Sequence, residues 1–257
     1  MRVTFSLIIA FVNLVCINQV FAASVATVTP IADSMSRALL ADTPIKVVYL
    51  PPKRLPINRI PSWLNKNRTE PLSSFDAIVN ISSMRPNLAF YTSVRSTNIH
   101  AVPIDIAEAL LPGGERVAVQ ETNEYFWLNS NNTLLMLGIL KRDLALLWPQ
   151  YAEKITQQYQ KVSNSLRQIS LDIDDHLLGS GYEGIINANK KTEAFSKGLL
   201  LPTISKQEAN TTESLHALTI STKKQSGQWV VDDFSRYSDT PFILRWQGIL
   251  TNLHSLE

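Results

Sequence analysis

An apolar stripe between residues 155 and 173 constrains the fold of this chain more than any other feature of its sequence. Its members alternate spacings of four and three residues: Ile155, Tyr159, Val162, Leu166, Ile169 and Ile173. This spacing places them on one face of an α-helix. Pro149 suits a first helical turn, and Gly179 and Gly181 allow the chain to stop and turn. We therefore predict a long helix over about 149–178.

Such a stripe forms either a coiled-coil seam or the buried face of a helix that lies along a globular body. A coiled coil needs several more heptads than this stretch contains. Because the stripe is short and stands alone in the sequence, we interpret it as a backbone helix lying along the domains.

The chain before this helix alternates β-branched apolar runs with helical or loop stretches. One helix is expected at 30–40, and strands are expected at 25–28, 45–50, 76–81 and 99–104. This order is typical of a parallel α/β lobe. We assign residues 24–128 to an N-terminal α/β lobe.

Two further segments complete the organisation. Residues 129–181 are expected to be helical, with Ser130 as the N-cap of a helix to about 147 and the long linking helix after it. Residues 182–257 form a small C-terminal α/β lobe, with strands at 183–188, 217–221 and 229–232. Asp239 or Thr240 can cap a last helix that begins at Pro241.

The N-terminus has the pattern of a secretory signal peptide. Arg2 precedes an apolar run from Phe5 to Val15, and Val20, Phe21 and Ala22 satisfy the small-x-small cleavage rule. We predict a signal peptide at 1–23, cleaved after Ala22 or Ala23, because the run is too short to span a bilayer; a retained anchor is the alternative. The chain's one cysteine, Cys16, leaves with this peptide, so the mature domain is held by its core.

Composition and motifs exclude several functions. The net charge is +2 and no Lys/Arg run is present, which argues against a nucleic-acid surface. The sequence contains no G-x-S-x-G, P-loop or HExxH motif, so we predict no enzyme. Residues 179–184 match G-x-G-x-x-G but follow a helix, which favours a helix cap and turn. Acidic residues at 172–175 with His176 suggest a metal site less strongly than a solvated helix end.

Four segments carry a resemblance to a known family. Residues 123–130, Asn-Glu-Tyr-Phe-Trp-Leu-Asn-Ser, resemble the Asp-Pro-His-Ile-Trp-Leu-Asp-Pro segment of the zinc and manganese solute-binding proteins that serve ABC importers. Residues 50–58 are similar to that family's Pro-Pro-Gly-x-x-Pro-His-Asp loop. Residues 184–199 resemble the start of its second lobe, and 230–234 the late strand that ends in a metal-binding aspartate. The resemblance covers nearly all of the mature chain.

The resemblance implies an α/β fold of two lobes with parallel sheets, joined by a long backbone helix, with a shortened second lobe. It also places five residues in a ligand cleft. Ile57, Tyr125 and Asn187 (or Asn189) stand where the family has histidines, and Asp232 or Asp233 stands for the aspartate. Isoleucine offers no donor, an amide only a weak carbonyl, and a phenol has a pKa of about 10. We therefore expect no high-affinity metal and no cofactor.

A slipped alignment is the alternative, and zinc or manganese would then bind elsewhere. The four histidines of the chain all lie outside the matching motifs: His100, His176, His216 and His254. The function implied is a periplasmic solute-binding-like component of a metal-type ABC import system with a degenerate metal site. Its partner would be an ABC permease of the inner membrane or another periplasmic protein, without nucleic acid and without a membrane span after signal cleavage. The alternative is a non-transport periplasmic interaction protein that kept the fold and lost the ligand.

Overall fold

The first lobe is built on a four-stranded parallel sheet. The computed structural model describes residues 23–67, 75–108, 125–211 and 215–256, so the predicted signal peptide lies outside it except for Ala23. The strand order is β2-β1-β3-β4, with the following bounds: β1 (Ser24–Thr27), β2 (Lys46–Tyr49), β3 (Ala77–Asn80) and β4 (Val102–Asp105).

Burial explains this strand order. The two central strands, β1 and β3, are buried along their whole length, as apolar strands covered on both faces are. The edge strands β2 and β4 are more exposed. Pro103 lies in β4, where a missing N–H costs no ladder hydrogen bond on the open side.

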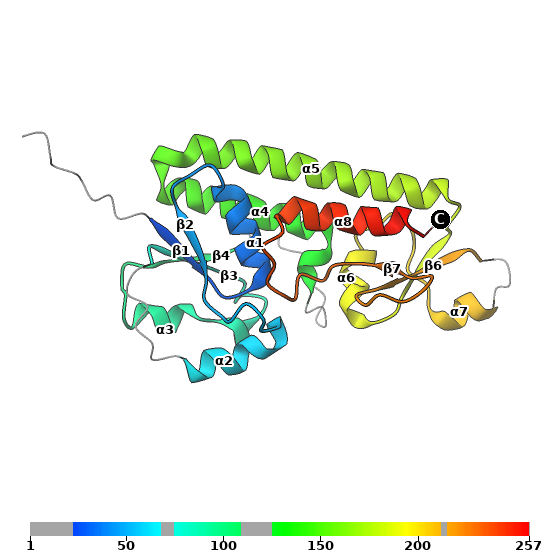
Figure 1. The fold of residues 1–257 in the computed structure, drawn as a ribbon, viewed down its shortest axis with the longest axis horizontal. Helices are drawn as coiled ribbons and strands as arrows, with labels where there is room; N and C mark the ends of the chain where they lie inside the picture. Colours follow the sequence, from blue (N-terminus) through cyan, green and yellow to red (C-terminus); the bar gives the residue numbers. More distant parts are fainter. Residues whose placement is uncertain (1–22, 68–74, 109–124, 212–214, 257) are drawn as a thin grey trace, which may run out of the picture.

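Helices cover both sides of this sheet (Figure 1). Helix α1 (Pro30–Leu40) has the predicted bounds, and the Thr29 side chain caps it by accepting from the Ala32 N–H at 3.4 Å. It packs on β2 and β3. The short helices α2 (Ile60–Lys66) and α3 (Tyr91–Arg95), which the sequence analysis did not predict, lie on the side of the sheet away from the long helix.

The predicted helical segment consists of α4 (Ser130–Leu147) and α5 (Ala152–Gly179). The prediction that Ser130 caps α4 is wrong. Asn129 is the cap, because its side-chain oxygen accepts from the N–H groups of Asn131 and Asn132, at 3.0 and 3.3 Å. Pro149 starts a 3₁₀ turn that leads into α5, and Gly181 turns the chain after it with a φ of 72°.

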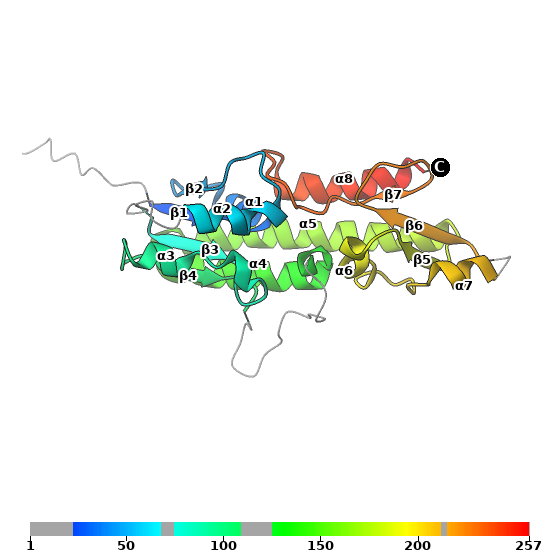
Figure 2. The same cartoon turned by 90° about the horizontal axis from the view of Figure 1, so that it is seen from below.

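The apolar stripe is the buried face of a backbone helix. Helix α5 packs against α1, α4 and α8 (Phe242–His254), and every member of the stripe is buried except the half-buried Tyr159. Figures 1 and 2 both show α5 running beside the two lobes. The stripe therefore joins the lobes into one body, and the coiled-coil alternative does not apply.

The second lobe has a three-stranded parallel sheet in the order β5-β6-β7. Its strands are β5 (Gly184–Asn187), β6 (Ala217–Ser221) and the two-residue β7 (Trp229–Val230). Its helices are α6 (Glu193–Ser196) and α7 (Lys206–Thr211), and the 3₁₀ turn η6 (Lys190–Thr192) precedes α6. Helix α8 begins beside α1 and runs along α5 to β7. The predicted two-lobed α/β class with a long linking helix is confirmed.

The predicted caps of α8 are wrong. Pro241 occupies the N-cap position, and no side-chain hydrogen bond caps this helix. Thr240 uses its N–H to bond the Ser238 hydroxyl at 3.1 Å, and the Asp239 carboxylate accepts from Tyr237 at 2.6 Å. Among the described residues, no side chain therefore caps the first turn of α8.

Leu166→Asp is expected to destabilise the protein by about 3–5 kcal/mol, because Leu166 is 0% exposed in the seam between α5 and its neighbours. Leu171→Asp is the matched control on the same helix, since Leu171 is 57% exposed; its effect should stay within about 0.5 kcal/mol. Urea unfolding followed by circular dichroism measures both. Equal effects would mean that the stripe is not the buried face.

Candidate functional site

Loops from both lobes meet between the two sheets. The loop after β2 contacts the segment after β7, where the Ile57 N–H donates to the Ser235 carbonyl at 2.8 Å. The turn η4 (Phe126–Leu128), just before α4, contacts the same segment, because Trp127 donates from Nε1 to the Asp233 carbonyl at 3.1 Å. The segment 231–241 therefore closes against two parts of the first lobe.

A lysine of the second lobe reaches this junction, with its side chain 41% exposed. Lys191, in η6, places its Nζ 2.9 Å from Oδ2 of Asp233 and 4.9 Å from the ring centroid of Tyr125. Asp233 is 14% exposed, and its other oxygen accepts from the Ser235 N–H at 2.9 Å. Two of the predicted cleft residues, Tyr125 and Asp233, are therefore brought together, and a positive charge from the chain itself lies between them.

The charge of this lysine is stabilised by its surroundings. Burial lowers the pKa of Lys191, but the interactions with Asp233 and Tyr125 together outweigh burial, so its pKa is raised above the ordinary value. The ammonium is thus protonated across the neutral range. The Tyr125 ring offers its negative face to it, as in a cation–π contact.

Asp232 is paired with a different cation. Its two oxygens accept from Nε and Nη2 of Arg245, in α8, at 2.7 Å each. The guanidinium carbon lies 3.9 Å from the Phe234 ring centroid, and the Arg245 side chain is only 5% exposed. Phe234 has a φ of 50°, a left-handed conformation uncommon for an aromatic residue. Of the two aspartates that the sequence left open, Asp233 is the one that faces Tyr125.

The remaining predicted positions do not supply ligands to this junction. Ile57 is buried and contacts the segment through its backbone. The Asn187 amide donates to the Ser196 hydroxyl of α6 at 2.9 Å, and Asn187 lines an open cavity of about 460 Å³ with residues of α6 and of 203–208. Asn189, the alternative third position, accepts from the Lys191 N–H at 3.0 Å as the cap of η6.

These residues do not fit a zinc or manganese ion. Within the described ranges, no three histidine, cysteine or acidic side chains come close enough together to hold a metal. Both aspartates already bind cationic side chains, and Lys191 would repel a second cation next to Asp233. A zinc site needs about three protein donors even when one position stays open.

Side chains of the acidic helix end at 172–176 make contacts with neighbouring parts of the protein. Asp172 accepts from the Gln168 amide at 2.7 Å, and Asp174 accepts from the Leu200 N–H at 3.0 Å. The His176 ring lies 4.6 Å from that of His254. The helix end therefore fastens α5 to α8 and to the loop after α6.

Lys191 and Arg245 are two site residues that were not predicted from the sequence. Lys191 follows Lys190, and such a pair is typical of a solvated turn; its partner is 42 residues away. Arg245 lies among the apolar residues of α8, and this placement was the available signal. A charged residue on the apolar face of a helix needs a buried partner.

Comparisons with known proteins agree with this architecture. No protein-family profile matches the sequence, and a search of curated proteins gives no match. Solved structures do match: the metal-dependent lipoprotein YcdH from Bacillus subtilis has a TM-score of 0.66 at 12% identity, covering 91% of this chain and 98% of its own. The solute-binding protein FpvC from Pseudomonas aeruginosa, solved with Mn²⁺, gives 0.62 at 11%, covering 90% and 96%. The laminin-binding protein Lbp of Streptococcus pyogenes gives 0.61 at 8%, covering 91% and 99%.

The chain therefore has the fold of the zinc- and manganese-type solute-binding proteins, as the sequence resemblance implied. Two of these matched proteins are named as binding proteins, FpvC for a solute and Lbp for laminin. In the described part of the chain, each helix is too short or too polar to cross a bilayer.

Proposed function

We propose that this protein is an exported solute-binding-like component of a metal-type ABC import system, in which the chain's own lysine takes the place of the metal. The observation that carries the proposal is the contact of Lys191 with Asp233 and Tyr125. Tyr125 and Asp233 stand at positions that match metal ligands, and a cation lies between them. The predicted signal peptide supports export, and the fold supports the solute-binding class.

The chemistry of the junction supports this substitution. The carboxylate of Asp233 carries a charge that needs compensation when no metal and no histidines are present. A lysine ammonium provides that charge and three donors. Oxygen acceptors and an aromatic face suit an ammonium better than a borderline metal, which prefers imidazole nitrogen. Lys191 thus stabilises the closed junction without an ion from solution.

Further contacts between the two lobes, near the Lys191 junction, support this closed arrangement. Lys53 lies 3.4 Å from Asp239, and the rings of Tyr49 and Tyr237 lie 4.9 Å apart. These pairs join the loop and strand end at β2 to the segment after β7. In this proposal the lobes stay closed whether or not metal is present.

The purified mature protein is expected to retain no stoichiometric zinc or manganese after incubation with either metal and dialysis. Elemental analysis measures this directly. His176→Ala is the control for weak binding at the His176–His254 pair, and it should leave the result unchanged. One tightly held zinc per chain, whether or not it is lost in His176→Ala, would contradict the proposal.

A second candidate is a non-transport interaction protein that kept the fold and lost the ligand. It is favoured by the match to Lbp, a protein of the same fold that binds laminin. The two candidates differ in their partner. Stimulation of the ATPase activity of the cognate ABC importer in proteoliposomes would support the transport role. No stimulation, together with specific binding to an extracellular protein, would support the interaction role.

A further inference from the structure

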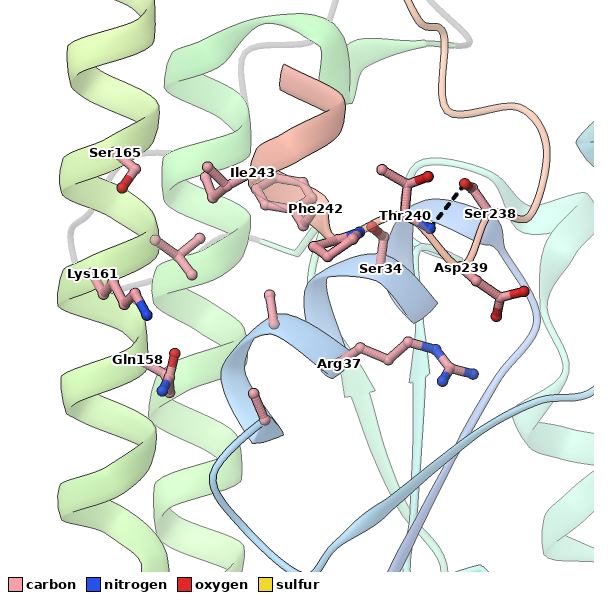
Figure 3. Close-up of a pocket in the computed structure, with 14 residues that line it drawn as sticks. Ser34, Arg37, Gln158, Lys161, Ser165, Ser238, Asp239, Thr240, Phe242 and Ile243 are labelled. Atoms are coloured by element: carbon pink, nitrogen blue, oxygen red, sulfur yellow. Dashed lines mark hydrogen bonds between the residues drawn. The ribbon is translucent and has the colours of Figure 1, made fainter. Parts of the chain in front are cut away.

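A second cavity lies away from the lysine junction, among three helices. It has a volume of about 340 Å³ and opens between α1, α5 and the start of α8 (Figure 3). Its walls are largely apolar and come from all three helices: Ala38, Ala41, Val162, Phe242 and Ile243. This is the size and character of a small-molecule site.

The charged side chains that line this cavity make one side of it positively charged. Lys161 extends from α5 toward the opening, and no residue of the described ranges forms an ion pair with it. Arg37 lines the cavity with its stem, because its guanidinium turns to Asp33 at 2.7 Å. The Asp239 carboxylate turns away as well, toward Tyr237 and Lys53.

The first turn of α8 adds a second source of positive potential. Helix α8 has 13 residues and no side-chain cap, and Pro241, Phe242 and Ile243 of its first turn line the cavity. The N–H groups at a helix start attract anions. Ser34 lies beneath this turn, at the back of the cavity. The residue is 5% exposed, and its hydroxyl has no hydrogen-bond partner in the part of the chain that the structure describes.

We propose that this cavity binds a small amphipathic carboxylate. The apolar body packs on Ala38, Val162 and Ile243, and the carboxylate lies at the start of α8 within reach of Lys161. This class follows from the combination of apolar walls, an uncapped helix start and, on one rim, a lysine without an ion pair among the described residues. The site is separate from the Lys191 junction, and the proposal does not depend on the fate of the metal.

The test is isothermal titration of the mature protein with decanoate and with the neutral decan-1-ol. Decanoate is expected to bind more tightly than decanol. Lys161→Met should weaken decanoate binding about three- to tenfold and leave decanol unchanged, since it removes one exposed charge. Lys154→Met, the matched change on the same helix outside the cavity, should alter neither affinity.

Ala38→Phe fills the cavity and should abolish binding of both compounds, and a thermal melt checks that this variant folds. If Ala38→Phe does not fold, Lys161→Met and Lys154→Met still decide the question. Absence of decanoate binding to the unmodified protein, or equal binding by Lys161→Met, would overturn the proposal. Decanoate binding that survives a folded Ala38→Phe would overturn it as well.

Discussion

Zinc binding is expected to appear when Ile57→His, Tyr125→His and Asn187→His are combined with Lys191→Ala. The sequence resemblance implies that these three positions and Asp233 match the family's ligands, so three imidazoles and one carboxylate would supply four donors once the competing ammonium is gone. We expect a dissociation constant at or below about 1 µM, measured by competition with a chromogenic chelator.

Two variants of that protein test the reasoning. With Lys191 retained, the three histidines should bind zinc at least about 100-fold more weakly, because a like charge lies against Asp233. Adding Asp233→Ala to the full set should weaken zinc binding, because three imidazoles remain but the anionic fourth donor is lost. If the folded protein with all four substitutions does not bind zinc, the four positions do not converge on one point. Position 187 would then be the misplaced one, because the Asn187 side chain is turned toward α6.

Asp232→Ala is expected to cost about 2–3 kcal/mol of stability, because it leaves the Arg245 guanidinium, which is 5% exposed, without its carboxylate; solvent screens the pair in part, since Asp232 is 37% exposed. Nη1 of Arg245 already has no hydrogen-bond partner among the described residues, so the guanidinium has no further acceptor there to replace the Asp232 carboxylate. Asp239→Ala is the matched control in the same segment. Its ion pair with Lys53 is exposed on both sides, so its loss should be much smaller.

A double variant separates the charge from the packing. Asp232→Ala with Arg245→Met should be more stable than Asp232→Ala alone, since an apolar side chain replaces an unpaired buried charge. Urea unfolding of the four proteins measures this cycle. A double variant that is less stable than the single one would mean that Arg245 acts mainly through its stacking on Phe234.

The parts of the fold that could be predicted are those with a strong local signal. The spacing of Ile155, Leu166 and Ile173 predicted α5, and Pro30 with the apolar residues after it predicted α1. The strands were predicted to within a few residues because buried parallel strands are apolar runs. Helices α2 and α3 have only seven and five residues, too few for a periodic pattern.

The site was less predictable because its contacts are distant in sequence. The motif at 123–130 identified Tyr125, but nothing near it indicates that a lysine 66 residues later covers its ring. Which of Asp232 and Asp233 contacts Lys191 depends on the left-handed turn at Phe234. A phenylalanine does not predict this conformation. Side-chain direction in such a turn is decided by tertiary packing, as the Arg245 pair shows.

Lys191 also changes how the junction depends on the medium. A dissolved ion stabilises a protein in proportion to the logarithm of its concentration above the dissociation constant. An ammonium carried on the same chain has a fixed effective concentration, which neither a chelator nor depletion of metal from the medium can lower. If Lys191 takes the place of the metal as proposed, closure of the lobes is a constant property of the folded molecule and does not depend on the metal supply.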